Sequence, residues 1–147
     1  MNSQPDDFQN LPDDCLTIAY KSTGRLRYFD SPYKLIAEID PAIAEYYRSL
    51  IPKSVRLNVP LHLPHISVVR REVPPILSPW GKYEGELVKF EYEPTIYNDE
   101  TYYWLNAYGL ALEAIRVELG LPVLGRPVSR AGFQRCFHIT IGNLKKT

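Results

Sequence analysis

The chain has 147 residues, in which 17 lysines and arginines balance 17 aspartates and glutamates, so its formal net charge is zero. This length fits a single domain that buries a core without metal or disulfide support. Proteins that hold long duplex nucleic acid through its phosphates usually carry an excess of basic residues, so the balanced charge predicts a small or short substrate. No apolar run approaches the roughly 20 residues of a membrane span, which predicts a protein without a membrane partner.

The first half of the chain predicts an N-terminal arm, a hairpin, a helix and two strands. Residues 1–14 are rich in Pro, Asp, Gln and Asn and predict a flexible arm ahead of a domain over residues 15–147. A strand at 16–20, a turn at 21–24 and a returning strand at 25–29 form the expected hairpin. Asp40 as N-cap and Pro41 at the first helical position predict a helix that ends near Pro52. Strands are expected at 55–59 and 65–70.

The second half predicts a loop, more strands and a second helix. Prolines at 74, 75 and 79 predict an irregular loop. Alternating residues predict strands at 86–92, 95–97 and 101–105, with a hairpin turn at 98–100. A helix is expected at 107–119, ended by Gly120, with an apolar face formed by Leu110, Ala111, Ala114, Ile115 and Val117. A final strand is expected at 136–142, so the order of helix, connection and strand occurs twice.

Two tetrapeptides in these expected strands repeat one pattern. His65-Ile66-Ser67-Val68 and His138-Ile139-Thr140-Ile141 both consist of a histidine, an apolar residue, a hydroxyl residue and an apolar residue, 73 positions apart. Side chains of a strand alternate between two faces, so each histidine shares a face with its hydroxyl while the apolar residues enter a core. If the two strands are neighbours, two imidazoles and two hydroxyls converge, which suits acid–base chemistry on a phosphodiester.

The paired motifs resemble those of the two-histidine (2H) phosphoesterases, a superfamily that includes RNA ligase-like 2′,5′ enzymes, cyclic phosphodiesterases and phage nucleases of immune cyclic nucleotides. Eight motif positions carry the resemblance, which spans about residues 16–144. It implies an α+β fold: a single domain of two pseudo-symmetric lobes, with antiparallel sheets flanked by helices around a central cleft. It also implies that His65 and His138 are catalytic and that Ser67 and Thr140 bind the phosphate.

The chemistry expected of these residues requires no metal or cofactor. One histidine would act as the base and the other as the acid, because the ordinary imidazole pKa near 6.5 allows either protonation state. The rival use of the histidines is a zinc site, but His62 and His65 are separated by a proline and no Cys-x-x-Cys or His-Glu-x-x-His spacing is present. His62 lies outside the repeated pattern.

Aromatic and basic residues supply candidates for substrate binding. Tyr97 and Trp104 are candidate stacking platforms for a base, although core-facing positions are the commoner role of such residues. The basic candidates for phosphate or base contacts are Lys21, Arg70, Arg130 and Arg135.

The expected function is cleavage of a small nucleotide, with a cyclic nucleotide or short oligonucleotide favoured over polymeric RNA. The compact chain is similar in this respect to phage anti-CBASS nucleases of the superfamily. One alternative is an enzyme of RNA ends or 2′,3′-cyclic phosphates, and another is a non-catalytic sponge that sequesters a nucleotide. The expected location is the cytoplasm, that of the host if a phage encodes the chain, because no secretory signal is found and Cys15 and Cys136 lie in apolar surroundings typical of reduced thiols.

Overall fold

The computed structural model describes residues 19–127 and 136–146. The elements are β1 (Tyr20–Phe29), β2 (Lys34–Glu38), α2 (Pro41–Ser49), the 3-10 turn η2 (Lys53–Val55), β3 (His65–Val69), β4 (Leu87–Asn98), β5 (Tyr102–Tyr108), α3 (Leu110–Glu118) and β6 (Phe137–Asn143). The expected arm over residues 1–14, the strand residues 16–18, and Cys15 lie outside the described residues. No helix in the described part of the chain is long and apolar enough to cross a membrane.

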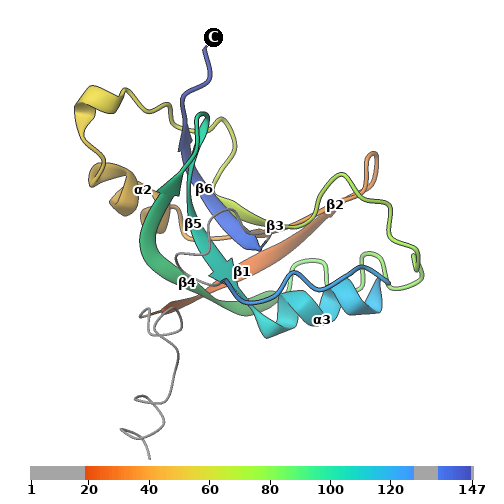
Figure 1. Ribbon diagram of the computed structural model, residues 1–147. Helices are drawn as coiled ribbons and strands as arrows, with labels where there is room; N and C mark the ends of the chain where they lie inside the picture. The colour runs from red at the N-terminus through yellow and green to blue at the C-terminus, as the bar shows by residue number, and fades with distance from the viewer. Residues whose placement is uncertain (1–18, 128–135, 147) are drawn as a thin grey trace, which may run out of the picture.

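The six strands form one closed antiparallel barrel in the order β1-β2-β3-β6-β5-β4 (Figure 1). Each half of the chain contributes a hairpin, a helix and a third strand, and these third strands, β3 and β6, pair with each other. The α+β class and the repeated order of helix, connection and motif strand are therefore confirmed. A separation into two lobes around a cleft is not shown.

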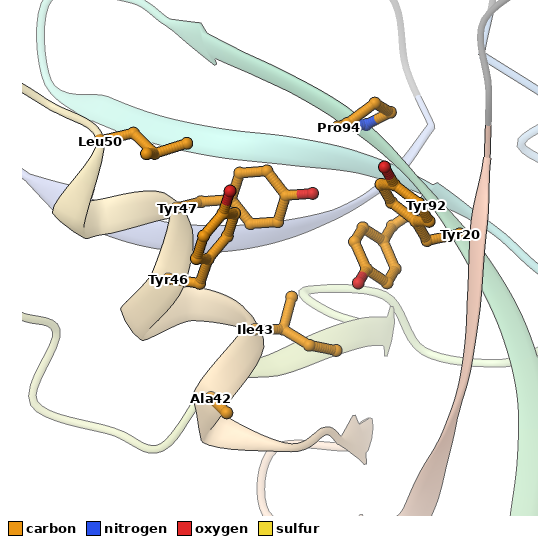
Figure 2. A pocket seen from close by; sticks show the side chains of 8 residues that line it. All are labelled: Tyr20, Ala42, Ile43, Tyr46, Tyr47, Leu50, Tyr92 and Pro94. Atoms are coloured by element: carbon orange, nitrogen blue, oxygen red, sulfur yellow. The ribbon is translucent and has the colours of Figure 1, made fainter.

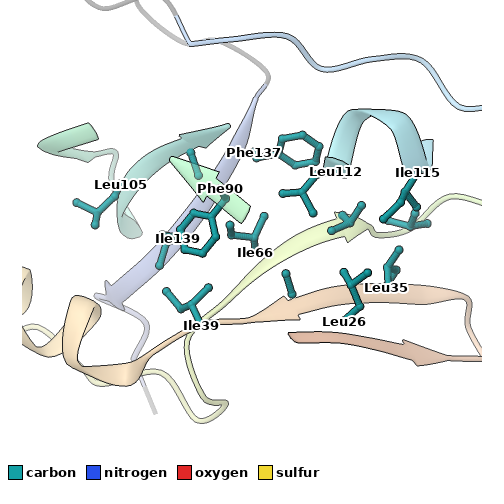
Figure 3. Close-up of a cluster of buried hydrophobic side chains, with 14 of the residues drawn as sticks. Leu26, Leu35, Ile39, Ile66, Phe90, Leu105, Leu112, Ile115, Phe137 and Ile139 are labelled. Atoms are coloured by element: carbon teal, nitrogen blue, oxygen red, sulfur yellow. The ribbon is translucent and has the colours of Figure 1, made fainter. Parts of the chain in front are cut away.

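The core joins apolar residues of the strands to the inner faces of the helices. Leu26, Ile66, Phe90, Leu105 and Ile139 come from five strands and are at most 1 % exposed. Figure 3 shows Leu112 and Ile115 of α3 directed toward the strand residues of this cluster. Ile66 and Ile139 are the second positions of the two motifs, so the expected inward direction of these positions is confirmed.

The first helix begins as predicted. Asp40 has an extended backbone, and its carboxylate accepts a hydrogen bond from Ala42 N at 2.9 Å. This satisfies a backbone donor that the helix itself leaves without a partner, while Pro41 occupies a position at which no donor is needed.

The predicted turn at 21–24 is wrong, because β1 runs through it and the hairpin turn lies at 30–33. Gly24 is a strand residue: a Cβ at this position would lie 3.1 Å from the Cβ of Ala37 on the neighbouring strand. The glycine therefore permits two strands to approach closely. Close approach of backbones, and not only a turn, can be the reason for a glycine in a sequence of this kind. The strand expected at 55–59 is also wrong, since this segment contains η2 and a single bridge from Asn58 to Asn143.

Candidate functional site

The pairing of β3 with β6 brings the two motifs together. The strands are antiparallel, and Ile66 lies opposite Ile139. This register places His65 opposite Thr140 and Ser67 opposite His138. Residues directly opposite in an antiparallel pair have side chains on the same face. The four motif residues therefore alternate across two neighbouring strands, and we call this surface the motif face.

The motif face is turned away from the core. Ile66, Val68, Ile139 and Ile141 are buried, whereas His65, Ser67 and Thr140 are half-buried and His138 is exposed. The histidines are diagonal neighbours, a relationship in which Cα atoms lie roughly 7–8 Å apart. Two imidazoles carried by Cα atoms at this separation can reach one phosphate group from two sides.

Both imidazoles are held by the same local hydrogen bond. His65 Nδ1 lies 2.8 Å from Leu63 O, and His138 Nδ1 lies 3.4 Å from Cys136 O, in each case the carbonyl two residues earlier in the chain. A carbonyl oxygen only accepts, so Nδ1 is the protonated nitrogen in both rings. In the neutral rings, Nε2 then carries the lone pair and is the atom available for proton transfer.

The environment lowers the pKa of both histidines. Burial is the main cause for each, since packing around the ring removes water that would solvate the cation, even though His138 as a whole residue is exposed. The Arg70 guanidinium also lowers both pKa values, His65 contributes to the lowering at His138, and Lys34 and His62 contribute at His65. The carbonyl hydrogen bonds act in the opposite direction. Both rings therefore favour the neutral form more than a free histidine does.

An aromatic row extends the motif face across β5 to β4. Trp104 lies opposite Thr140 in the register, and its ring meets that of His138 edge-on at a centroid distance of 6.4 Å. Tyr97 is stacked on Trp104 at 6.2 Å with an interplanar angle of 25°. Hydrogen bonds fix both rings, from Trp104 Nε1 to Asn106 Oδ1 at 3.0 Å and from Tyr97 Oη to Glu93 Oε1 at 2.9 Å. The row is thus a rigid apolar platform beside His138.

The basic candidates have different positions. Arg70 follows β3 directly and acts on both histidines, so it belongs to the site. Lys21 lies on β1, whose neighbours in the barrel are β2 and β4, so it is not on a strand adjacent to either motif strand. Arg130 and Arg135 lie outside the described residues.

Two residues that surround the motif histidines, Lys34 and Asn106, were not predicted from the sequence. Lys34, the first residue of β2, lowers the pKa of His65, and no sequence signal separates it from other surface lysines. Asn106 lies opposite His138 and accepts from Trp104. Its spacing of two residues from Trp104 on a strand is the signal that could have revealed it, because such residues share a face.

The described residues contain no group of three or more His, Cys, Asp or Glu side chains placed to hold a metal ion. Cys136 is a buried free thiol, and burial raises its pKa to about 11, so it remains protonated near neutral pH.

Comparison of the chain with family models, curated proteins and solved structures finds no match. The resemblance to the 2H phosphoesterases therefore rests on the two motifs.

Proposed function

We propose that this chain is a metal-independent 2H-type phosphodiesterase that cleaves a small nucleotide by acid–base catalysis with His65 and His138. The observation that carries the proposal is the register of β3 and β6, in which Ile66 opposes Ile139. A shift of one residue would turn one of the two motifs away from the other. The observed pairing instead supports a site with two imidazoles and two hydroxyls on one face.

In this mechanism one neutral imidazole accepts a proton from the attacking oxygen through Nε2, while the other, protonated, donates to the leaving oxygen. The backbone carbonyls at Nδ1 hold each ring in the orientation that this requires. Ser67 and Thr140 would donate to non-bridging phosphate oxygens, which is supported by their position on the same face as the histidines and by the lack of a hydrogen-bond partner for either hydroxyl among the described residues. Arg70 supplies positive charge for the developing phosphorane.

The surroundings favour a nucleotide as substrate. Lys34 acts on His65, Arg70 acts on both histidines, and the platform of Trp104 and Tyr97 lies beside His138. A ligand with its phosphate between the imidazoles and a base on the platform matches this arrangement. Base stacking on an aromatic ring contributes about 1–3 kcal/mol. With the balanced net charge, this favours a cyclic nucleotide or short cyclic oligonucleotide signal. The two β-β-α-β halves would correspond to the two lobes of a 2H enzyme, with the motif face as the floor of its cleft.

The nearest alternatives are an enzyme of RNA ends or 2′,3′-cyclic phosphates and a sponge that binds a nucleotide without cleaving it. Binding alone would be served as well by Arg or Lys as by paired histidines, which favours the enzymes. The test is product analysis after incubation in EDTA with cyclic dinucleotides, cyclic trinucleotides and 2′,3′-cyclic mononucleotides. Cleavage of a cyclic oligonucleotide is expected. Tight binding with unchanged ligand would instead establish the sponge, and activity that depends on added metal would contradict the mechanism.

A further inference from the structure

A pocket lies between α2, β1 and β4. Four tyrosines, Tyr20, Tyr46, Tyr47 and Tyr92, line a pocket of about 530 Å³, and Ile43, Leu50 and Pro94 complete most of its wall (Figure 2). No residue of the motif face contributes to it. We call this surface the tyrosine groove.

The four rings follow one another in a row. Centroids of Tyr46 and Tyr47 lie 4.9 Å apart, those of Tyr47 and Tyr92 6.1 Å apart, and those of Tyr92 and Tyr20 5.8 Å apart. The interplanar angles are 84°, 86° and 49°, so no two successive rings are parallel. The groove therefore has no pair of parallel rings between which a flat nucleotide base could stack. Tyr20 and Tyr46 are exposed, whereas Tyr47 is 5 % exposed and Tyr92 is half-buried, so the first two offer ring surface to an elongated ligand and the other two form the floor of the groove.

The wall of the groove is uncharged but carries hydrogen-bond donors. None of its lining residues is Lys, Arg, Asp or Glu. The described residues offer no hydrogen-bond partner to the four phenol groups. Burial raises the pKa of Tyr47 and Tyr92, so their hydroxyls stay protonated as donors. The groove thus suits a neutral ligand with many acceptors and provides no cation for a phosphate.

We propose that the tyrosine groove binds a proline-rich segment of a partner protein in the polyproline II conformation. Such a segment has no internal hydrogen bonds, so its carbonyl groups are free to accept from phenols. Its pyrrolidine rings pack on aromatic faces, and its fixed φ reduces the entropy lost on binding. Aromatic-lined grooves are the usual receptors of these segments.

The carboxylate of Asp40 favours a positively charged residue of the ligand at one end of the tyrosine groove. Asp40 is exposed, stands two residues before the groove residue Ala42, and its carboxylate contributes to the raised pKa of Tyr92. A basic residue flanking the prolines would therefore be attracted to this end of the groove. An exposed ion pair of this kind changes affinity only a few-fold.

The test uses a synthetic polyproline peptide of about ten residues with an arginine at one end, titrated into the full-length protein and followed by NMR of the tyrosine rings. The control peptide has the same length and charge but consists of Gly and Ser. Saturable binding of the proline peptide with Kd below about 1 mM, with shifts at groove tyrosines, is expected. Tyr46→Ala should weaken binding at least tenfold, while Val117→Ala, at an exposed site on α3, should not.

Asp40→Asn isolates the charge. Asparagine caps a helix as well as aspartate does, so α2 should persist while affinity for the arginine peptide falls about two- to fivefold. Affinity for a neutral polyproline peptide should not change. Equal binding of the Gly/Ser peptide, or binding that Tyr46→Ala leaves intact, would overturn the proposal. Self-association abolished by Tyr46→Ala, or displacement of the peptide by a free nucleoside, would assign the groove to a second copy or to a small ligand instead.

Discussion

At the scale of single residues, His65 and His138 share the same local hydrogen bond, from Nδ1 to the carbonyl two residues earlier. Each ring leaves Nε2 outside this hydrogen bond, so the bond itself does not distinguish a base from an acid. This equivalence fits a reaction in which the two roles exchange when the direction reverses.

Replacement of either histidine by alanine should reduce the rate of phosphodiester cleavage by about 10²–10⁴-fold, because each variant lacks one proton-transfer group. Ligand affinity should stay within about tenfold, and the double variant should be little slower than either single variant, since the two groups act as a unit. Single-turnover rates and equilibrium binding measure these quantities. His62→Ala removes an exposed imidazole outside the motifs whose one effect on the site is a contribution to the lowered pKa of His65, so it is the matched control and should change the rate less than tenfold. If His62→Ala reduced the rate as much as the motif variants do, the assignment of catalysis to His65 and His138 alone would be wrong.

The pH profile should reflect the lowered pKa of both histidines. A bell-shaped curve of kcat/KM against pH is expected, with its maximum on the acidic side of the ordinary histidine pKa near 6.5. Burial is the largest cause of the lowered pKa of both histidines, and Arg70 adds to it. Arg70→Met should therefore move both limbs of the pH–rate curve to higher pH, but the two pKa values should stay below that of a free histidine. NMR titration of the two imidazoles provides the same test without substrate. Unchanged imidazole titrations in Arg70→Met would place the guanidinium away from the site.

The motif face was predictable because its pattern is local, whereas its surroundings were not. Alternation along a strand is sufficient to put His65 with Ser67 and His138 with Thr140. The neighbouring position of β3 and β6 depends on a register between distant segments, and the contribution of Lys34 depends on the pairing of β2 with β3. Such long-range pairings are not encoded in any short stretch of sequence.

At the scale of elements, α3 shows how long-range partners override a sequence pattern. The predicted apolar face is wrong except at Ile115, because Leu110, Ala111, Ala114 and Val117 are all exposed, Leu110 and Val117 to 75 % and 57 %. Leu112 and Ile115 face the core, together with two charged residues, Glu113 and Arg116.

The buried charges of α3 have partners elsewhere in the chain. Arg116 donates to both carboxylate oxygens of Glu72, at 2.9 and 3.0 Å, and to Val68 O at 2.8 Å at the end of the motif strand β3. The Glu113 carboxylate accepts from the backbone of Leu124 and Gly125. Charged residues are read from sequence as solvent-exposed, so this orientation required the structure.

Arg116→Met should destabilise the protein by about 3–5 kcal/mol, because it removes the ion pair of a buried guanidinium with Glu72 and the hydrogen bond that this guanidinium donates to the buried Val68 carbonyl. Val117→Ala, one residue further on the exposed face of α3, should change the free energy of unfolding by less than about 0.5 kcal/mol. Urea unfolding followed by circular dichroism measures both. If Arg116→Met and Glu72→Gln together were as destabilising as the sum of the single variants, the two side chains would not be coupled.

At the scale of the whole molecule, the barrel interleaves its two halves. The first half supplies β1, β2 and β3 and the second supplies β4, β5 and β6, but both boundaries in the barrel are pairings between halves, β3 with β6 and β1 with β4. The helices also cross over, since Arg48 of α2 donates to Ile141 O of β6, and Arg116 of α3 donates to Val68 O of β3. Each half alone would therefore expose two strand edges and part of the core.

Division of the chain in the exposed segment after Leu77 tests this arrangement. Fragments 1–77 and 78–147 should each lack stable tertiary structure. With unpaired strand edges and half of the core, each would gain too little from burial to offset the conformational entropy lost on folding. Mixed together, they should form a 1:1 complex with the circular dichroism of the intact chain, detected by analytical ultracentrifugation. A comparison mixture in which the second fragment carries Ile139→Asp should not assemble, since this residue is completely buried where β3 meets β6. If either fragment instead folds cooperatively alone, the two halves of the chain are independent folding units and the interleaved barrel is not needed for their stability.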